Sequence, residues 1–128
     1  MDSSKKIGNI GEGVAKNYLK EKGYKILDKN FRYSKLGELD IITQRDDDII
    51  FFEVKARMRK GLSEFNPEDN ITQTKQKKLV KLAQIWLAKH PPAGGTDISW
   101  QIDILAIEIY RNKSFDIRHI ENAVGDFY

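Results

Sequence analysis

The sequence predicts an α/β fold in which a mixed central β-sheet is flanked by helices. Two observations carry this prediction. Segments with helical and strand periodicity follow one another in the order helix, three strands, helix, two strands. The chain has 128 residues, the size of one ordinary domain, and no repeat, low-complexity tract or long linker divides it. We therefore expect a single domain covering residues 1–128.

The first half of the chain contains one helix pattern and three strand patterns. Apolar residues recur at three-four spacing over Ile7–Lys22, which predicts an amphipathic helix, and Gly23 is a typical residue to end it. Short polar turns at 35–37 and 45–48 separate the strand-like runs that follow. These runs are Tyr24–Ser34, Glu38–Gln44 and Ile49–Ala56.

The second half continues with a loop, a helix and two strands. Arg57–Pro67 is polar and is expected to be a mobile loop. A second helix is expected from about Glu68 to Lys89. Pro67 is expected to open it, because proline favours the first position of a helix. The last two strands are expected at Ile98–Tyr110 and Ser114–Ile120.

Composition restricts the chemistry of any functional site. The chain has no cysteine, which excludes disulfides, thiolate metal sites and cysteine nucleophiles, and it has only two histidines. A metal ion would therefore be a hard cation held by carboxylate oxygens. The net charge of +3 permits a polyanionic partner without demanding one. No window approaches the ~18 apolar residues of a membrane span, so we expect a soluble, cytoplasmic protein with no membrane partner.

Two neighbouring strands carry charged residues in a suggestive arrangement. Because side chains alternate along a strand, Glu38 and Asp40 share one face, and Glu53 and Lys55 share a face of the next strand. A short hairpin turn at 45–48 would place Asp40 opposite Glu53 and Glu38 opposite Lys55. Directly opposed carboxylates, with Cβ atoms ~4.5–5.5 Å apart, repel each other unless a cation lies between them. The arrangement predicts a site for Mg²⁺ or Mn²⁺.

The alternative is that these charges belong to a solvated sheet face or form cross-strand ion pairs, which is the commoner situation for a Glu-x-Lys sequence alone. However, Glu53 and Lys55 lie at the end of the apolar run 49–55, which is typical of a buried central strand. Charged side chains in such a strand need partners or a function.

One residue on each helix lies on the apolar stripe that should face the sheet. Glu12 shares a stripe with Gly8, Ala15 and Leu19, although an acid in a first helical turn is also favoured by the helix dipole. Lys75 lies four residues from both Ile71 and Leu79, and could either extend its ammonium group to solvent or reach over the sheet towards a phosphate.

Further basic residues could contact a nucleic-acid backbone. Arg57, Arg59 and Lys60 follow the strand that carries Glu53, and Lys78 lies on the second helix among other lysines. Lysine-rich helix faces are more often simply solvated. Asp103 lies in an otherwise apolar strand run, and its spacing does not decide between a structural acid, an arginine partner and a member of the site.

The charged strands resemble a known nuclease motif. Gly37-Glu38-Leu39-Asp40-Ile41-Ile42 and Phe51-Phe52-Glu53-Val54-Lys55-Ala56-Arg57 resemble the PD-(D/E)XK motif, with Leu39 in place of the proline. The fuller pattern resembles the small bacterial YraN-like proteins, relatives of archaeal Holliday-junction resolvases. It adds Gly8-x-x-Gly11-Glu12-x-x-Ala15, Gly23-Tyr24, Asn30-Phe31-Arg32 and Lys75. Gln101-Ile102-Asp103 replaces the Arg-Phe-Asp of that family, so any role of the arginine is missing.

This resemblance implies a restriction-endonuclease-like fold and a nucleic-acid-binding surface. Our first hypothesis is therefore a Mg²⁺-dependent endonuclease acting on DNA, with the selectivity of the resolvases for junction-like structures as one version of it. Asp40 and Glu53 would hold one or two metal ions, with the Val54 carbonyl as a further ligand. Glu12 would complete a second metal site or hold the lysine of the motif, and Glu38 joins the candidate catalytic residues.

The resemblance also implies roles for two lysines. Lys55 would orient or deprotonate the attacking water and stabilise developing negative charge, and Lys75 would steady the scissile phosphate. A resolvase cuts two strands symmetrically, so that version of the function requires a homodimer.

Two other functions remain compatible with the sequence. One is a nucleic-acid-binding module whose metal site is idle, because folds outlive their chemistry. The other is a protein–protein adaptor on the same sheet, which predicts no salt-sensitive affinity for DNA.

Overall fold

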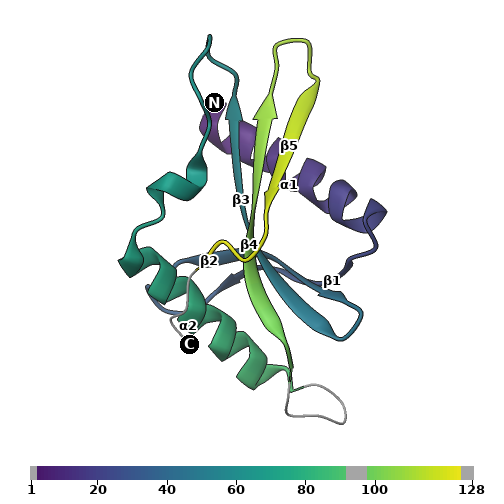
Figure 1. The fold of residues 1–128 in the computed structure, drawn as a ribbon, viewed down its shortest axis with the longest axis vertical. Helices are drawn as coiled ribbons and strands as arrows, with labels where there is room; N and C mark the ends of the chain where they lie inside the picture. The colour runs from purple at the N-terminus through teal and green to yellow at the C-terminus, as the bar shows by residue number, and fades with distance from the viewer. Residues whose placement is uncertain (1–2, 92–97, 125–128) are drawn as a thin grey trace.

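Five strands form one mixed β-sheet, and two long helices pack against it (Figure 1). The computed structural model describes residues 3–91 and 98–124. Within them the elements are α1 (Ser3–Glu21), β1 (Lys25–Arg32), β2 (Glu38–Arg45), β3 (Asp48–Met58), the 3₁₀ helix η1 (Pro67–Asn70), α2 (Gln73–Lys89), β4 (Trp100–Ile109) and β5 (Phe115–Ile120). The predicted α/β class with a mixed sheet flanked by helices is confirmed.

The strands lie in the sheet in chain order, β1-β2-β3-β4-β5. Neighbours pair antiparallel except β3 and β4, which are parallel. A parallel pair cannot be joined by a tight turn, and the chain makes this connection through η1 and α2. The helices cover opposite faces, α1 one face and α2 the other (Figure 1). Among the described residues, no helix is both long and apolar enough to cross a membrane.

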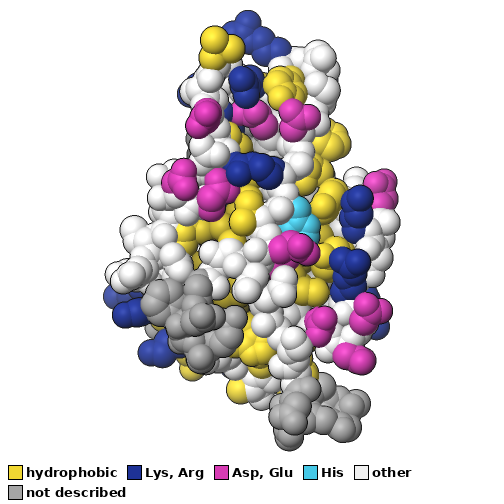
Figure 2. Space-filling view, in the orientation of Figure 1, with side chains coloured by type: hydrophobic (Ala, Val, Ile, Leu, Met, Phe, Trp, Pro, Cys, Tyr) yellow, Lys and Arg dark blue, Asp and Glu magenta, His cyan; other side chains and the backbone are white. Residues whose placement is uncertain are grey.

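On the face in Figure 2, Lys and Arg side chains alternate with Asp and Glu side chains. This agrees with a net charge of only +3 from 22 basic and 19 acidic residues. A functional surface must therefore be identified from local geometry and not from a broad field of one sign.

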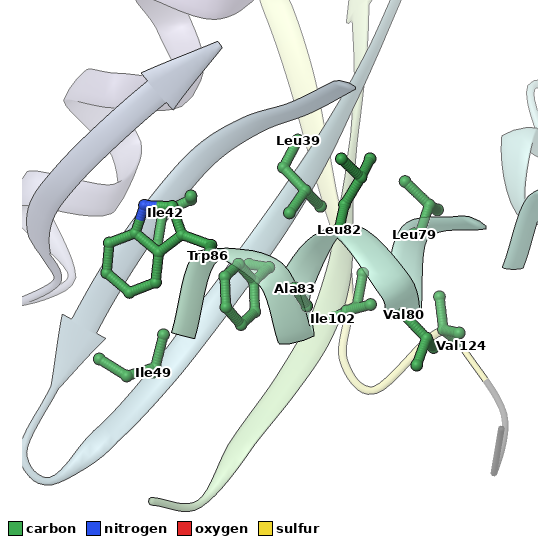
Figure 3. Close-up of a cluster of buried hydrophobic side chains, with 11 residues drawn as sticks. Leu39, Ile42, Ile49, Leu79, Val80, Leu82, Ala83, Trp86, Ile102 and Val124 are labelled. Atoms are coloured by element: carbon green, nitrogen blue, oxygen red, sulfur yellow. The ribbon is translucent and has the colours of Figure 1, made fainter. Parts of the chain in front are cut away.

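The core on the α2 side is built from apolar residues of α2, β2, β3 and β4 (Figure 3). Leu79, Leu82 and Trp86 project from α2 onto the sheet, each less than 5% exposed. The Trp86 indole also donates a hydrogen bond to Asp28 Oδ2 at 3.0 Å. This stripe fixes the rotation of α2, and Lys75 begins it one turn before Leu79.

The core on the α1 side depends on a close approach between α1 and β3. Ala15 and Leu19 are completely buried against strand residues that include Phe52. Gly11 lies so near β3 that a Cβ atom there would be only 2.5 Å from Cβ of Ala56. The absence of a side chain at Gly11 therefore lets α1 pack closely and brings the next residue, Glu12, to the sheet.

The hairpin between β2 and β3 has the predicted register over its paired length, from Arg45 opposite Asp48 to Ile41 opposite Phe52. The ladder then stops, so the predicted direct pairs of Asp40 with Glu53 and of Glu38 with Lys55 are wrong. The physical reason is that the Asp40 side chain, rather than the β2 backbone, accepts the Val54 N–H.

The predicted mobile loop, Arg57–Pro67, overlaps the end of β3. β3 continues through Arg57 to Met58, because β4 offers a parallel partner and Arg57 lies opposite Glu108 in that ladder. The second helix also differs, since Pro67–Asn70 is a 3₁₀ turn and α2 begins at Gln73. The Thr72 hydroxyl caps α2 by accepting a hydrogen bond from Lys75 N at 3.1 Å, which provides a better start than proline alone.

Candidate functional site

The candidate site lies where β2 and β3 stop pairing. At this point Asp40 Oδ2 accepts a hydrogen bond of 2.7 Å from the backbone N–H of Val54. The bond satisfies a main-chain donor that the ladder no longer pairs, and it fixes the position of the carboxylate. The point at which the β2–β3 ladder ends is therefore marked by an aspartate whose position is fixed.

Two more carboxylates meet Asp40 there. Oxygen atoms of Glu12, Glu38 and Asp40 all lie within 4.8 Å of one another. Asn30 joins the two glutamates, because its side-chain amide donates to Glu12 Oε1 at 3.2 Å and to Glu38 Oε1 at 3.1 Å. Arg32 forms an ion pair with Glu38. The helix stripe and the family resemblance together predicted that Glu12 belongs to this site, and its carboxylate lies near that of Asp40.

The carboxylates shift each other's protonation. Burial, together with the neighbouring charges of Glu38 and Glu53, raises the pKa of Asp40 to about 8, although the Val54 N–H opposes this shift. Burial also tends to raise the pKa of Glu38, but hydrogen bonds with Asp40, Arg32 and Asn30 outweigh it and lower that pKa. The pKa values of the two neighbouring carboxyl groups are thus pushed apart, which is the expected response of crowded carboxylates.

Glu53 occupies a different electrostatic position, because two lysines meet one of its oxygen atoms. Lys55 Nζ lies 3.1 Å and Lys75 Nζ 2.9 Å from Glu53 Oε1. The other oxygen, Oε2, is buried and has no hydrogen-bond partner among the described residues. Lys75 arrives from α2, so the site combines a strand of the sheet with helices from both of its faces.

Lys55 remains in its charged form in this arrangement. Burial tends to lower the pKa of Lys55, but the Glu53 carboxylate and the contact with Lys75 outweigh burial and raise that pKa. Its ammonium group is therefore suited to donating hydrogen bonds and to balancing negative charge. Acting as a base would require the loss of the contact with Glu53.

The donor set fits a hard divalent cation. It consists of oxygen atoms only, and it includes the buried Oε2 of Glu53, which lacks a partner among the described residues. The structure adds Glu38 to the predicted ligand candidates, because Glu38 forms a close carboxylate group with Asp40 and Glu12. Among the described residues, the predicted ligand Glu53 lies outside that group. At Val54 the N–H contacts Asp40, and its carbonyl stays a predicted ligand.

The predicted nucleic-acid contacts fall into two groups. Arg57 and Arg59 are both occupied with Glu108, at 2.7 Å from its Oε2 and 2.8 Å from its Oε1 respectively. Lys60 and Lys78, by contrast, are exposed. The arginines therefore stabilise the end of β3 whether or not they meet a phosphate.

Asp103 is a structural acid away from the carboxylate group around Asp40. It is completely buried, and its Oδ2 lies 2.7 Å from His119 Nε2. Its Oδ1 accepts hydrogen bonds of 2.8 Å from the Gln101 side chain and from the Asn122 N–H. Gln101 thus serves as a partner of this acid.

Sequence reasoning missed two groups that contribute to the site. Asn30 and Arg32 were noted only as part of a motif, although both contact Glu38. Asn30 has a φ of 54°, a left-handed conformation that asparagine tolerates better than most residues. An asparagine inside a strand pattern was the available signal, because asparagine is uncommon in regular strands.

These features define the class of protein. A mixed five-stranded sheet between helices, with acids and a lysine where two strands separate, is a restriction-endonuclease-like α/β fold. The sequence profile described as "Uncharacterised protein family UPF0102" matches residues 11–117, and the chain belongs to this family.

Relatives in this family extend over nearly the whole chain. A UPF0102 protein of Vibrio campbellii is 39% identical over 124 residues, covering 97% of this chain and 96% of its own. One of Fervidobacterium nodosum is 43% identical over 124 residues, covering 97% and 86%. Among solved structures, Pyrococcus furiosus SfsA in complex with Ca²⁺ matches with a TM-score of 0.36 and 14% identity, over 92% of this chain and 63% of that one. That likeness is too distant to carry an argument.

Proposed function

We propose that this protein is a metal-dependent endonuclease acting on DNA. The observation that carries the proposal is the Glu53 side chain, whose charge acts on Asp40, with one oxygen bound by two lysines and the other buried without a partner among the described residues. A carboxylate of this kind is costly as a purely structural element and well suited to sharing a cation.

The carboxylates hold the cation in this proposal. Asp40 and Glu53 are the central ligands, and Glu12 and Glu38 lie close enough to Asp40 to complete one or two sites. When bound, Mg²⁺ or Mn²⁺ acts as a Lewis acid towards phosphate oxygens. Asn30 orients Glu12 and Glu38, since its amide donates to both.

The lysines act on the phosphate and the attacking water. Lys55 and Lys75 present two ammonium groups on the same side of Glu53. A phosphate oxygen would replace Glu53 Oε1 as the partner of both lysines, and Glu53 would be among the residues that hold the cation. Lys55 then orients the water and balances charge that develops on the phosphate, and Lys75 holds the scissile phosphate in place.

DNA binding rests on phosphate contacts around this centre. Lys60 and Lys78 are exposed, the first just after β3 and the second on α2. Arg57 lies on β3 together with Lys55, and Arg59 directly follows that strand. If the substrate is a junction with two equivalent cutting positions, two copies of the chain must act together as a homodimer.

The test is incubation of the purified protein with junction, flap and linear DNA in Mg²⁺, in Mn²⁺ and in EDTA. We expect cutting that requires the cation and that Asp40→Asn abolishes. Wild-type protein that cuts none of these DNA forms with either cation would refute the nuclease proposal. The Asp40→Asn variant separates cutting by the site from cutting by a contaminant.

A second candidate function is a DNA-binding module with an idle metal site. The observation that favours it is the neutralisation already present, because Lys55 and Lys75 balance Glu53 while Arg32 balances Glu38. It predicts salt-sensitive DNA binding without cation-dependent cutting. A protein–protein adaptor would instead show no salt-sensitive affinity for DNA.

A further inference from the structure

A pocket of about 210 Å³ adjoins the two lysines of the site, between the end of β3 and η1. Lys55 and Lys75 form its charged side, and Phe65, Pro67 and Ile71 form its apolar side. Pockets for drug-sized ligands have volumes of about 300–1,000 Å³, so this one suits a single small ring system.

The apolar wall is held in place from two directions. The Arg57 guanidinium lies over the Phe65 ring, 4.7 Å from its centroid, and is itself fixed by Glu108. Arg118 on β5 binds the Phe65 carbonyl oxygen and forms an ion pair with Glu68 at 3.1 Å. A wall anchored to both β3 and β5 is preorganised to receive a rigid ligand.

The pocket also offers one polar recognition group. The Asn70 side chain lines it, is exposed, and makes no hydrogen bond to any residue the structure describes. An amide can both donate and accept, as recognition of a base edge requires. Ammonium groups for a phosphate, an aromatic ring and a free amide are together the partners of one nucleotide.

We infer that this pocket receives an unpaired nucleobase of the DNA, next to the phosphate bound by Lys55 and Lys75. The inference rests on the proposed function and narrows its substrate. In duplex DNA the bases are stacked inside the helix, so a base can enter this pocket only after leaving the stack. The preferred substrate therefore has an unpaired nucleotide beside the scissile phosphate, as in a flap, a fork or a distorted junction.

The experiment measures binding to forked DNA by fluorescence anisotropy in EDTA, with a single abasic nucleotide moved along the unpaired arm. Removing a base leaves every phosphate in place, so the electrostatic part of binding stays constant. We expect one abasic position to weaken wild-type binding about 5- to 100-fold, the contribution of one stacked base. Phe65→Ala should weaken binding to the intact fork. In this variant, no abasic position should weaken binding further.

Phe115→Ala is the matched control, because Phe115 is a 48% exposed phenylalanine on β5 that does not line the pocket. It should retain the wild-type dependence on abasic position. Asn70→Ala, which truncates an exposed side chain, should reduce that dependence even if Phe65→Ala disturbs folding.

The outcomes separate the inference from the function on which it rests. Equal binding at every abasic position overturns the base pocket but leaves the nuclease proposal, which is judged by cation-dependent cutting. A dependence on abasic position that persists in both the Phe65 and Asn70 variants also overturns the pocket. A wild-type protein that shows no salt-sensitive binding to DNA would overturn both the base pocket and the nuclease proposal.

Discussion

The Asp40 carboxylate accepts the backbone N–H of Val54 at 2.7 Å, at the point where β2 and β3 part. The same side chain therefore pairs with the backbone of β3 and belongs to the carboxylate group of the site. Its second oxygen remains for the neighbouring carboxylates or for a cation. This double role determines how the site should respond to substitution.

The first prediction concerns the two central carboxylates. Asp40→Asn and Glu53→Gln should abolish cation-dependent cutting, because each loses a ligand charge, while DNA affinity is retained or slightly higher as repulsion from phosphate falls. Cutting by gel assay and binding by anisotropy measure the two effects. Undiminished cutting by either variant would exclude that residue as a ligand.

The two variants should differ in stability. Asn at position 40 can still accept the Val54 N–H, and burial already favours a neutral group there, as the raised pKa of Asp40 shows. We expect a melting temperature equal to or above that of the wild type at neutral pH. Glu53→Gln removes the partner of Lys55 and Lys75 and should lower the melting temperature.

A second prediction separates the lysines from the cation. Lys55→Ala should stop cutting but leave Mn²⁺ binding intact or tighter, since lysine supplies no ligand oxygen and its charge repels the cation. Calorimetric titration with Mn²⁺ measures this. Lys81→Ala, at an exposed position of α2 that does not line the pocket, is the control and should change neither quantity.

A third prediction tests the close packing that positions Glu12. Gly11→Ala should destabilise the protein by about 1–3 kcal/mol, because its Cβ would lie 2.5 Å from Cβ of Ala56. Gly13→Ala is a matched control, since its Cβ would meet nothing within 4 Å, and should stabilise α1 by about 0.5–1 kcal/mol. Urea unfolding measures both, and equal effects would contradict the packing argument.

A fourth prediction concerns Glu108, which holds Arg57 and Arg59. Glu108→Gln should cost about 1–2 kcal/mol at pH 7, as charge-assisted hydrogen bonds are replaced by neutral ones. Burial tends to raise the pKa of Glu108, but hydrogen bonds from Arg57 and Arg59 outweigh it and lower that pKa.

The sign of the pH dependence follows from that lowered pKa. The stabilisation is complete above the ordinary glutamate pKa of 4.5 and is lost as pH falls through the lowered value in the folded protein. The difference in unfolding free energy between wild type and Glu108→Gln should therefore shrink at acid pH. Urea titrations at neutral and acid pH measure this difference in unfolding free energy. A difference that does not change with pH would mean that the two arginines do not stabilise the protein through Glu108.

A fifth prediction concerns the salt dependence of DNA binding. Each phosphate contact should contribute ~0.9 to the slope of log affinity against log salt concentration on duplex DNA. Lys60→Ala and Lys78→Ala should each reduce the slope by about that amount if the residue meets a phosphate. A flat dependence in the wild type would favour the protein–protein adaptor.

The sequence by itself determined the order of the elements, the α/β class and the register of the β2–β3 hairpin as far as Ile41 and Phe52. These features depend on local periodicity and on a turn of fixed length, which neighbouring residues decide. The inward stripe of the first helix, together with the family resemblance, likewise predicted that Glu12 would belong to the site of Asp40.

Only the tertiary structure decided how the charges are shared. Three contacts of the site and its surroundings join segments that are distant in sequence. They are the hydrogen bond between Asp40 and Val54, the ion pair between Lys75 and Glu53, and the ion pair between Arg57 and Glu108. Such contacts arise when strands separate and helices dock, because a charged group is then placed among whichever partners the packing brings near. Spacing along one strand could not supply that information, since it fixes the face of a side chain but not its neighbour.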